Sequence, residues 1–106
     1  MARRKDDVAW SDPALLILGS LASGAKHGYA IVQEVEATAG ISLGPGTLYG
    51  ALPRLEQRGL VRALPGDDRR RPYELTAEGA RVLRARLEAM QAFAARGLSL
   101  LAPVTP

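Results

Sequence analysis

The sequence predicts a mainly α-helical fold with one small β-hairpin, arranged as a winged helix-turn-helix and followed by a long C-terminal helix. Three stretches with apolar residues at helical spacing precede Gly59. Two short stretches of strand character then flank turn-forming residues at 65–68, and a helical pattern returns after Thr76. Three helices followed by a hairpin is the order of elements in a winged helix-turn-helix.

The first two expected helices have start and stop signals. Ser11 and Asp12 are residue types that cap helices, and the helix after them should end by Gly24. This helix carries apolar residues on nearly all of its sides, which predicts that it is buried on more than one side. A second helix is expected from about His27 to Gly40, a natural C-terminal stop. His27 is the only histidine, has no evident catalytic partner and is interpreted as a local cap.

The third expected helix begins within residues 45–47 and ends at Gly59. Pro53 falls inside it, where a proline removes one backbone hydrogen bond. Because Pro53 is expected on the exposed side, we predict a mild bend rather than a broken helix. A narrow apolar stripe should face the core and consists of Leu48, Ala51, Leu52 and Leu55.

The hairpin and the last helix follow Gly59. Strands are expected at residues 60–64 and 72–75, joined by turn-forming residues. Thr76 suits the cap of the last helix, and Glu78 in its first turn is favoured by the helix dipole. The helical pattern should reach about Leu98.

Composition restricts the chemistry that the chain can perform. Of its 106 residues, 47% are hydrophobic, which suits one compact domain with an additional element. The absence of cysteine excludes disulfides, thiolate catalysis and cysteine-bound zinc, and no metal or cofactor is expected. A net charge of +3 permits a polyanionic partner without demanding one. No signal-peptide pattern or membrane-spanning stretch is evident, so a cytoplasmic protein is expected.

Five segments carry a specific combination of motifs. They are HGYAI at residues 27–31, GPGTLYGAL at 44–52, RLE at 54–56, GLV at 59–61 and RPYELTAEG at 71–79. Together they resemble the PadR family of transcriptional regulators over roughly residues 14–90. The resemblance implies a homodimeric repressor that binds double-stranded operator DNA and is released by a small molecule or another signal. It also implies a DNA-binding domain with an N-terminal arm at residues 1–76 and a dimerisation helix with a tail at residues 77–106, as in the short subfamily.

The third helix is the candidate DNA-recognition element. Its positive N-terminal end suits phosphate, and arginine and glutamine side chains suit base edges. Periodicity alone leaves open a solvated amphipathic helix with Tyr49 packed at the edge of the core, and the resemblance favours DNA contact. The candidate DNA-binding residues of this helix are Thr47, Tyr49, Gly50, Arg54, Gln57 and Arg58.

Arginines gather at the expected tip of the hairpin. Arg69, Arg70 and Arg71 suit a minor groove or its phosphates, and Lys26 before the second helix is a further candidate phosphate contact. The alternative is a solvated turn, partly neutralised by neighbouring aspartates. Position at the tip of a wing favours DNA contact, and Arg62 on the first strand is placed to join this patch.

The last helix is the candidate dimer interface. Its apolar stripe is long, and the three-helix unit already has apolar faces of its own, so a second subunit is expected to cover the surplus. The alternative is a stripe that belongs to the core of one chain. Trp10 and Phe93 suit a ligand pocket between subunits, although simple packing explains them equally well. The expected interface residues are Leu15, Leu18, Leu83, Leu87, Met90, Phe93 and Ala94.

A different class of function remains open from the sequence. A winged-helix module that binds a protein rather than specific DNA uses the same fold. The arginines of the third helix and of the hairpin argue against that alternative. An enzyme is not expected, because the chain has no paired carboxylates at helical spacing, no phosphate-binding loop and no partnered histidine.

Overall fold

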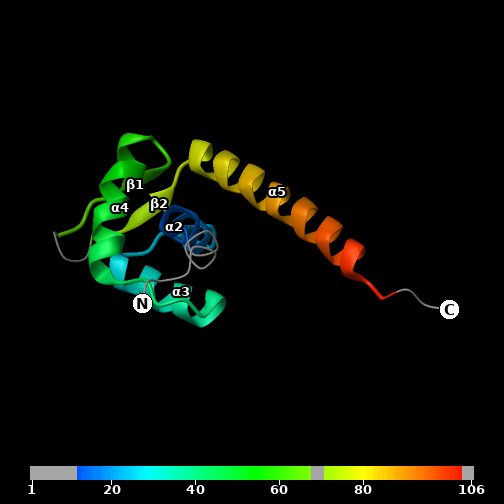
Figure 1. Ribbon diagram of the computed structural model, residues 1–106. Coiled ribbons are helices and arrows are strands. Elements are labelled where there is room, and N and C mark those ends of the chain that lie inside the picture. Colours follow the sequence, from blue (N-terminus) through cyan, green and yellow to red (C-terminus); the bar gives the residue numbers. More distant parts are fainter. Residues whose placement is uncertain (1–11, 68–70, 104–106) are drawn as a thin grey trace.

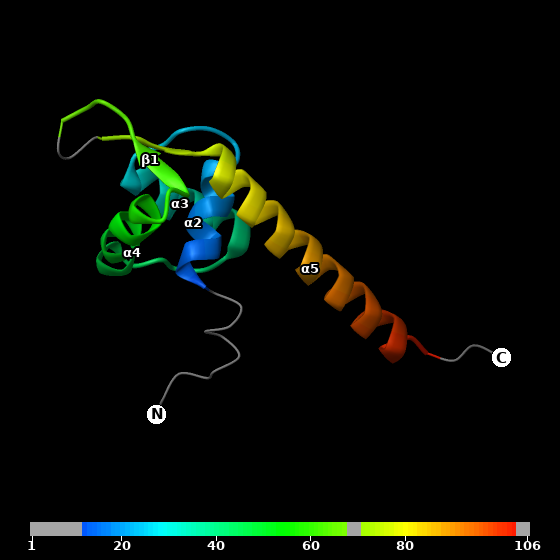
Figure 2. The same cartoon turned by 90° about the horizontal axis from the view of Figure 1, so that it is seen from above.

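The computed structural model describes residues 12–67 and 71–103, and its elements follow the predicted order. The elements are α2 (Pro13–Leu21), α3 (Gly28–Ala39), α4 (Pro45–Gln57), β1 (Val61–Ala63), β2 (Tyr73–Leu75) and α5 (Ala77–Leu101). The short helices and the hairpin pack into one head, from which α5 extends as an arm (Figure 1). The hairpin and α5 point in opposite directions from this head (Figure 2). The predicted winged helix-turn-helix with a long C-terminal helix is therefore confirmed.

Local signals set the ends of α2 and α3. The Asp12 side chain caps α2 by accepting a 3.0 Å hydrogen bond from the backbone N–H of Ala14. The helix ends at Leu21, and the chain turns before Gly24, whose φ is 144°. His27 occupies the N-cap position of α3, but its side chain makes no capping hydrogen bond, so the local cap predicted for it is not formed. Gly40 ends α3 in the left-handed region that glycine favours.

The helix α4 continues through Pro53 without interruption to Gln57. Pro53 is exposed, as is Tyr49 one turn earlier, so the carbonyl that loses its hydrogen bond lies on the solvent side. The prediction that Pro53 does not break the helix is confirmed. The chain reverses after Arg58 at Gly59, whose φ is 76°.

The hairpin is a two-stranded antiparallel sheet with the register Val61↔Leu75, Arg62↔Glu74 and Ala63↔Tyr73. The backbone of Lys26 adds an isolated bridge to β2, through hydrogen bonds of 3.0 and 2.9 Å with Tyr73. No feature of the sequence predicts this bridge. It fixes the loop between α2 and α3 directly to the base of the wing.

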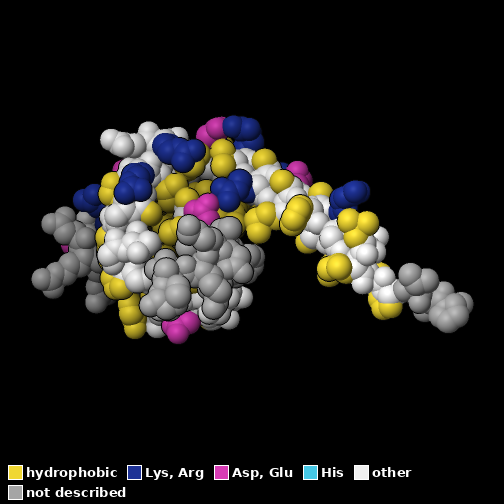
Figure 3. Space-filling model, viewed as in Figure 1, with side chains coloured by type: hydrophobic (Ala, Val, Ile, Leu, Met, Phe, Trp, Pro, Cys, Tyr) yellow, Lys and Arg dark blue, Asp and Glu magenta, His cyan; other side chains and the backbone are white. Residues whose placement is uncertain are grey.

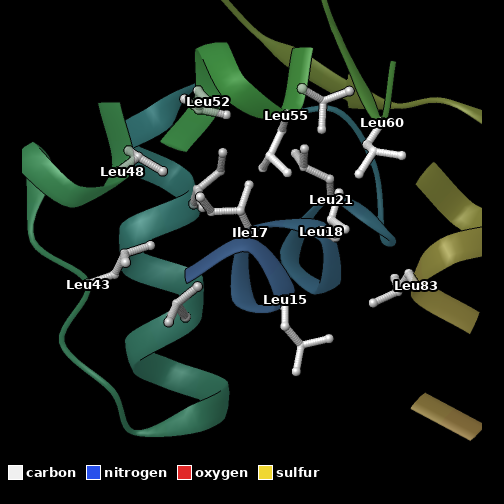
Figure 4. Close-up of a cluster of buried hydrophobic side chains, with 13 residues drawn as sticks. Leu15, Ile17, Leu18, Leu21, Leu43, Leu48, Leu52, Leu55, Leu60 and Leu83 are labelled. Carbon is white, nitrogen blue, oxygen red and sulfur yellow. The ribbon is translucent and has the colours of Figure 1, made fainter. Parts of the chain in front are cut away.

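The core lies where α2, α3 and α4 meet (Figure 4). The apolar side chains of α2 are shared among three neighbouring helices, since α2 contacts α3, α4 and α5. Leu18 is only 3% exposed in this cluster, so it packs in the core of one chain, and its predicted role in a dimer interface stays a prediction. Leu15 and Leu83 are also buried in the cluster, where they join α2 to the first turns of α5.

The start of α5 is fixed to the wing by Thr76 and Gly79. The Thr76 hydroxyl donates a 2.6 Å hydrogen bond to the carbonyl of Gly59 and accepts one of 2.9 Å from the backbone N–H of Gly79. A Cβ at Gly79 would overlap the carbonyl oxygen of Leu60, so only glycine allows this close approach. The predicted cap at Thr76 is confirmed, and α5 runs to Leu101, slightly beyond the expected end.

No helix in the described part of the chain combines the length and apolar character that crossing a bilayer requires.

Candidate nucleic-acid interface

The helix α4 turns one side to the core and the other to solvent. Leu48, Leu52 and Leu55 are buried, as the apolar stripe predicted. All six residues that the sequence assigned to DNA contact are exposed: Thr47, Tyr49, Gly50, Arg54, Gln57 and Arg58. The structure therefore presents the predicted recognition residues on one helix, on the side away from the core.

A groove of about 420 Å³ runs between α4 and the first turn of α2. It brings Thr47, Gly50, Arg54 and Arg58 together with Asp12. We call this feature the α4 groove. Its lining consists of Asp12, Pro13, Ala14, Gly46, Thr47, Gly50, Ala51, Arg54, Leu55 and Arg58. The sequence predicted the α4 side of the groove, but no sequence pattern indicates that the start of α2 forms the opposite side.

Tyr49 points to a different flank of α4 from the groove. A Cβ placed on Gly28 would lie 2.8 Å from Cζ of Tyr49, so the ring rests against the first turn of α3. Tyr49 is nevertheless 52% exposed. The structure thus combines the two expectations for Tyr49, since the side chain packs at the edge of the core and still reaches solvent.

The arginines of the α4 groove have no acidic partner among the described residues. Within residues 12–67 and 71–103, the side chains of Arg54 and Arg58 form neither an ion pair nor a hydrogen bond. Other cations are paired: Arg62 with Glu74 across the hairpin, and Arg81 with Glu78 along α5. An exposed guanidinium without a carboxylate partner keeps all its donors available for phosphate or a base edge.

The side chain of Lys26 has a structural role within the chain, while its predicted contact with phosphate stays a prediction. Its ammonium lies 3.0 Å from Oε1 of Glu34 and donates to the carbonyl of Ser20, the hydroxyl of Ser23 (2.8 Å) and the carbonyl of Gly24 (3.1 Å). The three donors of the ammonium are thereby satisfied. Hydrogen bonds from Lys26 and then from Ser20 lower the pKa of Glu34. Lys26 therefore holds the end of α2 against α3.

The wing carries the remaining predicted arginines. Arg69 and Arg70 lie outside the described residues, whereas Arg71 is exposed at the base of the turn. Arg62 was expected to join the basic patch at the tip. Its guanidinium instead donates to Glu74 directly across the two strands, so its charge is locally neutralised.

The distal half of α5 leaves large apolar side chains uncovered. Phe93 is 82% exposed and Leu101 is 81% exposed, and Leu87 is 47% exposed nearer the head. The expected interface included Leu87 and Phe93 but not Leu98, Leu100 or Leu101, which are also strongly exposed. Of the two residues predicted to line a ligand pocket, Phe93 projects from this half of α5 and Trp10 lies outside the described residues.

A second, more apolar groove of about 250 Å³ lies between α2, α3 and α5. Leu15, Leu83, Leu87 and Met90 line it, together with Val35 of α3. Four of these residues belong to the predicted dimer interface. The structure therefore brings part of that interface together at one apolar hollow, although Leu18 and Phe93 do not belong to its lining.

An exposed helix with unpaired arginines, supported by two further helices and flanked by a two-stranded wing, defines a winged helix-turn-helix protein. Comparison with known families agrees with this class. The chain belongs to the PadR-like family of transcriptional regulators, whose family model matches residues 17–85. The resemblance seen in the sequence is confirmed, since the matching family is one of transcriptional regulators.

Solved structures of similar fold include regulators from several organisms. A PadR family transcription regulator from Clostridium difficile is 26% identical with a TM-score of 0.74, covering 84% of this chain and 97% of its own. RosR of H. salinarum is 32% identical with a TM-score of 0.65, and the match covers 87% of this chain and 77% of the RosR chain. F93 from STIV, a winged-helix DNA-binding protein, shares the fold alone, with 18% identity and a TM-score of 0.69. That match covers 76% of this chain and 89% of the F93 chain.

A relative with higher sequence identity is an uncharacterised 37.1 kDa protein of transposon Tn4556 from Streptomyces fradiae. The two are 44% identical over 86 residues, which is 81% of this chain. The chain spans about a quarter of the length of that relative, because the match covers 25% of it.

Proposed function

We propose that this chain is a homodimeric repressor that binds operator DNA through α4 and the wing and is released by a small-molecule signal. The observation that carries the proposal is the exposed side of α4, where Arg54 and Arg58 have no acidic partner in the described chain. In the proposed division, residues 1–76 bind DNA and residues 77–106 dimerise.

The first turn of α4 supports entry into a DNA groove. Gly44 is its N-cap and makes no side-chain capping hydrogen bond, so the first amides of the helix remain available to a phosphate. Gly46 and Gly50 lie on the exposed side, and a Cβ at either position would meet no atom of the described residues within 4 Å. Nothing inside the chain therefore requires glycine at position 50, whereas a closely approaching DNA backbone or base edge does.

The proposed dimer rests on the unpaired face of α5. Its apolar or small residues recur with alternating spacings of four and three, the pattern of helices that pack along a seam. The positions are Leu87, Met90, Ala94, Gly97 and Leu101, which continue the row that Leu83 begins in the core. Ala94 and Gly97 allow close helix approach, and Phe93 adds an aromatic side chain on the flank. A twofold axis at this seam would set two copies of α4 about one DNA turn apart, roughly 34 Å.

The proposed signal is a small apolar molecule. The apolar groove between α2, α3 and α5 borders the seam through Leu87 and Met90. A ligand that fills this groove contacts α5 and the head together, so it can change their relative orientation and the spacing of the two recognition helices. Phe93, and Trp10 at the N-terminal side of α2, are proposed to line the same ligand site in the dimer.

An unbiased selection of bound duplexes from a random pool tests this function. We expect enrichment of a palindromic site whose half-sites are about 10 base pairs apart, and release of that duplex by some members of a panel of apolar compounds. The absence of any enriched duplex at low salt would contradict specific DNA binding. Retained binding of a protein partner by the same preparation would then favour a winged-helix interaction module.

A further inference from the structure

Asp12 connects two elements that lie far apart in the sequence. Its Oδ1 accepts the capping hydrogen bond from the backbone N–H of Ala14, and its Oδ2 accepts a 3.1 Å hydrogen bond from the guanidinium of Arg86. Arg86 is 74 residues away, in the first half of α5. The carboxylate therefore holds the first turn of α2 and binds α5 at the same time.

The position of this ion pair places it beside the recognition helix. Asp12 lines the α4 groove, across which lie Thr47, Arg54 and Arg58. In Figure 3, basic side chains lie over both α4 and α5 on the side of the molecule that is drawn. The side chain of Asp12 is 34% exposed, so its charge acts on the groove itself.

A carboxylate in this position opposes the entry of phosphate. An unneutralised negative charge there would repel the DNA backbone. It would also compete with the DNA phosphates for the guanidinium groups of Arg54 and Arg58. Arg86 supplies the opposite charge at contact distance. With Arg86 in place, the net charge of the groove comes from the two arginines of α4.

We propose that Arg86 is a positioning residue for DNA binding, which keeps the α4 groove open to phosphate by holding and neutralising Asp12. This inference rests on the proposed DNA-binding function. It adds a residue of α5 to the determinants of DNA affinity, although α5 itself is assigned to dimerisation.

Stability alone does not account for this pair. Both side chains are at least a third exposed, 48% for Arg86 and 34% for Asp12, and exposed ion pairs contribute little to the free energy of unfolding. Substitution of Arg86 should therefore leave the thermal midpoint nearly unchanged while it changes DNA affinity. The two readouts separate a role in the DNA interface from a role in the fold.

A double-mutant cycle tests the proposal, with Kd measured for the selected duplex at one fixed salt concentration. Arg86→Gln should weaken binding about threefold to tenfold, because it leaves the Asp12 charge uncovered. Asp12→Asn should bind at least as tightly as the unmodified protein, since asparagine caps a helix as well as aspartate does. The double variant should have the same Kd as Asp12→Asn, because residue 12 then carries no charge whether or not Arg86 is present.

Arg84→Gln is the matched control, since Arg84 is exposed on the same helix and has no ion pair in the described chain. It should leave Kd unchanged, and sedimentation should find the same oligomer for every variant. The proposal is overturned if Arg86→Gln binds like the unmodified protein, if the double variant stays as weak as Arg86→Gln, or if Arg86→Gln loses the dimer. Failure of the unmodified protein to bind any duplex would instead contradict the proposed function.

Discussion

The ammonium of Lys26 lies 3.0 Å from the carboxylate of Glu34, and the backbone of Lys26 pairs with Tyr73 of the wing. One residue thus joins α2, α3 and the wing. The orientation of the wing relative to α4 depends on this junction. The side chain of Lys26 therefore stabilises the fold of the head, and its predicted contact with phosphate stays a prediction.

Lys26→Ala should lower the thermal midpoint while the folded variant keeps its affinity for DNA. The pKa of Glu34 is lower in the folded protein than its ordinary value, so folding favours the ionised carboxylate. That contribution is present above the ordinary pKa of glutamate and is lost as the pH falls through the lowered value. The difference in thermal midpoint between the variant and the unmodified protein should accordingly narrow on acidification. A loss of DNA affinity at an unchanged midpoint would show that Lys26 contacts DNA after all.

Gly50→Ala should stabilise the protein and weaken its binding to DNA. Alanine in a helix interior is favoured over glycine by about 0.5–1 kcal/mol, and the added Cβ meets nothing within the chain. The same Cβ would hinder the approach of a DNA backbone or base edge. Gly19→Ala is the control, because a Cβ there also meets no described atom within 4 Å and Gly19 does not line the α4 groove. Equal DNA affinity for the two variants would contradict close approach at Gly50.

Gly79→Ala should destabilise the protein by about 1–3 kcal/mol, measured by denaturant unfolding. The new Cβ would overlap the carbonyl oxygen of Leu60 and lie 2.9 Å from Cδ1 of Leu75, so the wing or the start of α5 must shift. Gly19→Ala is the control, since a Cβ at Gly19 meets no described atom within 4 Å and Gly19 lies outside the α5 seam. An unchanged free energy of unfolding for Gly79→Ala would show that the junction is more adaptable than its geometry indicates.

Ala94→Lys should convert the proposed dimer into a monomer in sedimentation experiments. Ala94 lies on the α5 seam, where a charged side chain would have to be buried against the partner helix. Ala92→Lys adds the same charge on the opposite side of the helix, two residues away, and should leave the dimer intact. If both variants stay dimeric, the seam is not the interface. If both become monomeric, the effect comes from the added charge rather than from the seam.

Features with local causes could be predicted from the sequence. The cap at Thr76, the stop at Gly40 and the buried stripe of α4 depend on residues within one or two turns of each other, and the sequence predicts all three. The exposed side of α4 follows directly from that stripe. The recognition residues could therefore be identified as a set, although their individual DNA contacts stay predictions.

Contacts between distant segments could not be predicted in the same way. In the sequence Lys26 looks like an exposed cation, whereas in the structure α2 and α3 place the carbonyl of Ser20 and the carboxylate of Glu34 next to its ammonium. Leu18 could belong to a dimer interface until the packing of three helices around α2 buries it. The pairing of Asp12 with Arg86 depends on where α5 crosses α2, which no local pattern indicates.

The central claim is that Arg54 and Arg58 of α4 bind DNA phosphates or base edges. Its most direct test measures Kd of the Arg54→Ala, Arg58→Ala double variant for the selected duplex across a range of salt concentrations. The control is the Arg84→Ala, Arg96→Ala double variant, which removes two exposed arginines without ion pairs in the described part of α5. We predict weaker binding for the α4 variant and no change for the control. The slope of log K against log salt should fall by about 0.9 for each phosphate that the α4 variant no longer neutralises. Equal affinity and equal slope for the α4 variant and the unmodified protein would contradict the account.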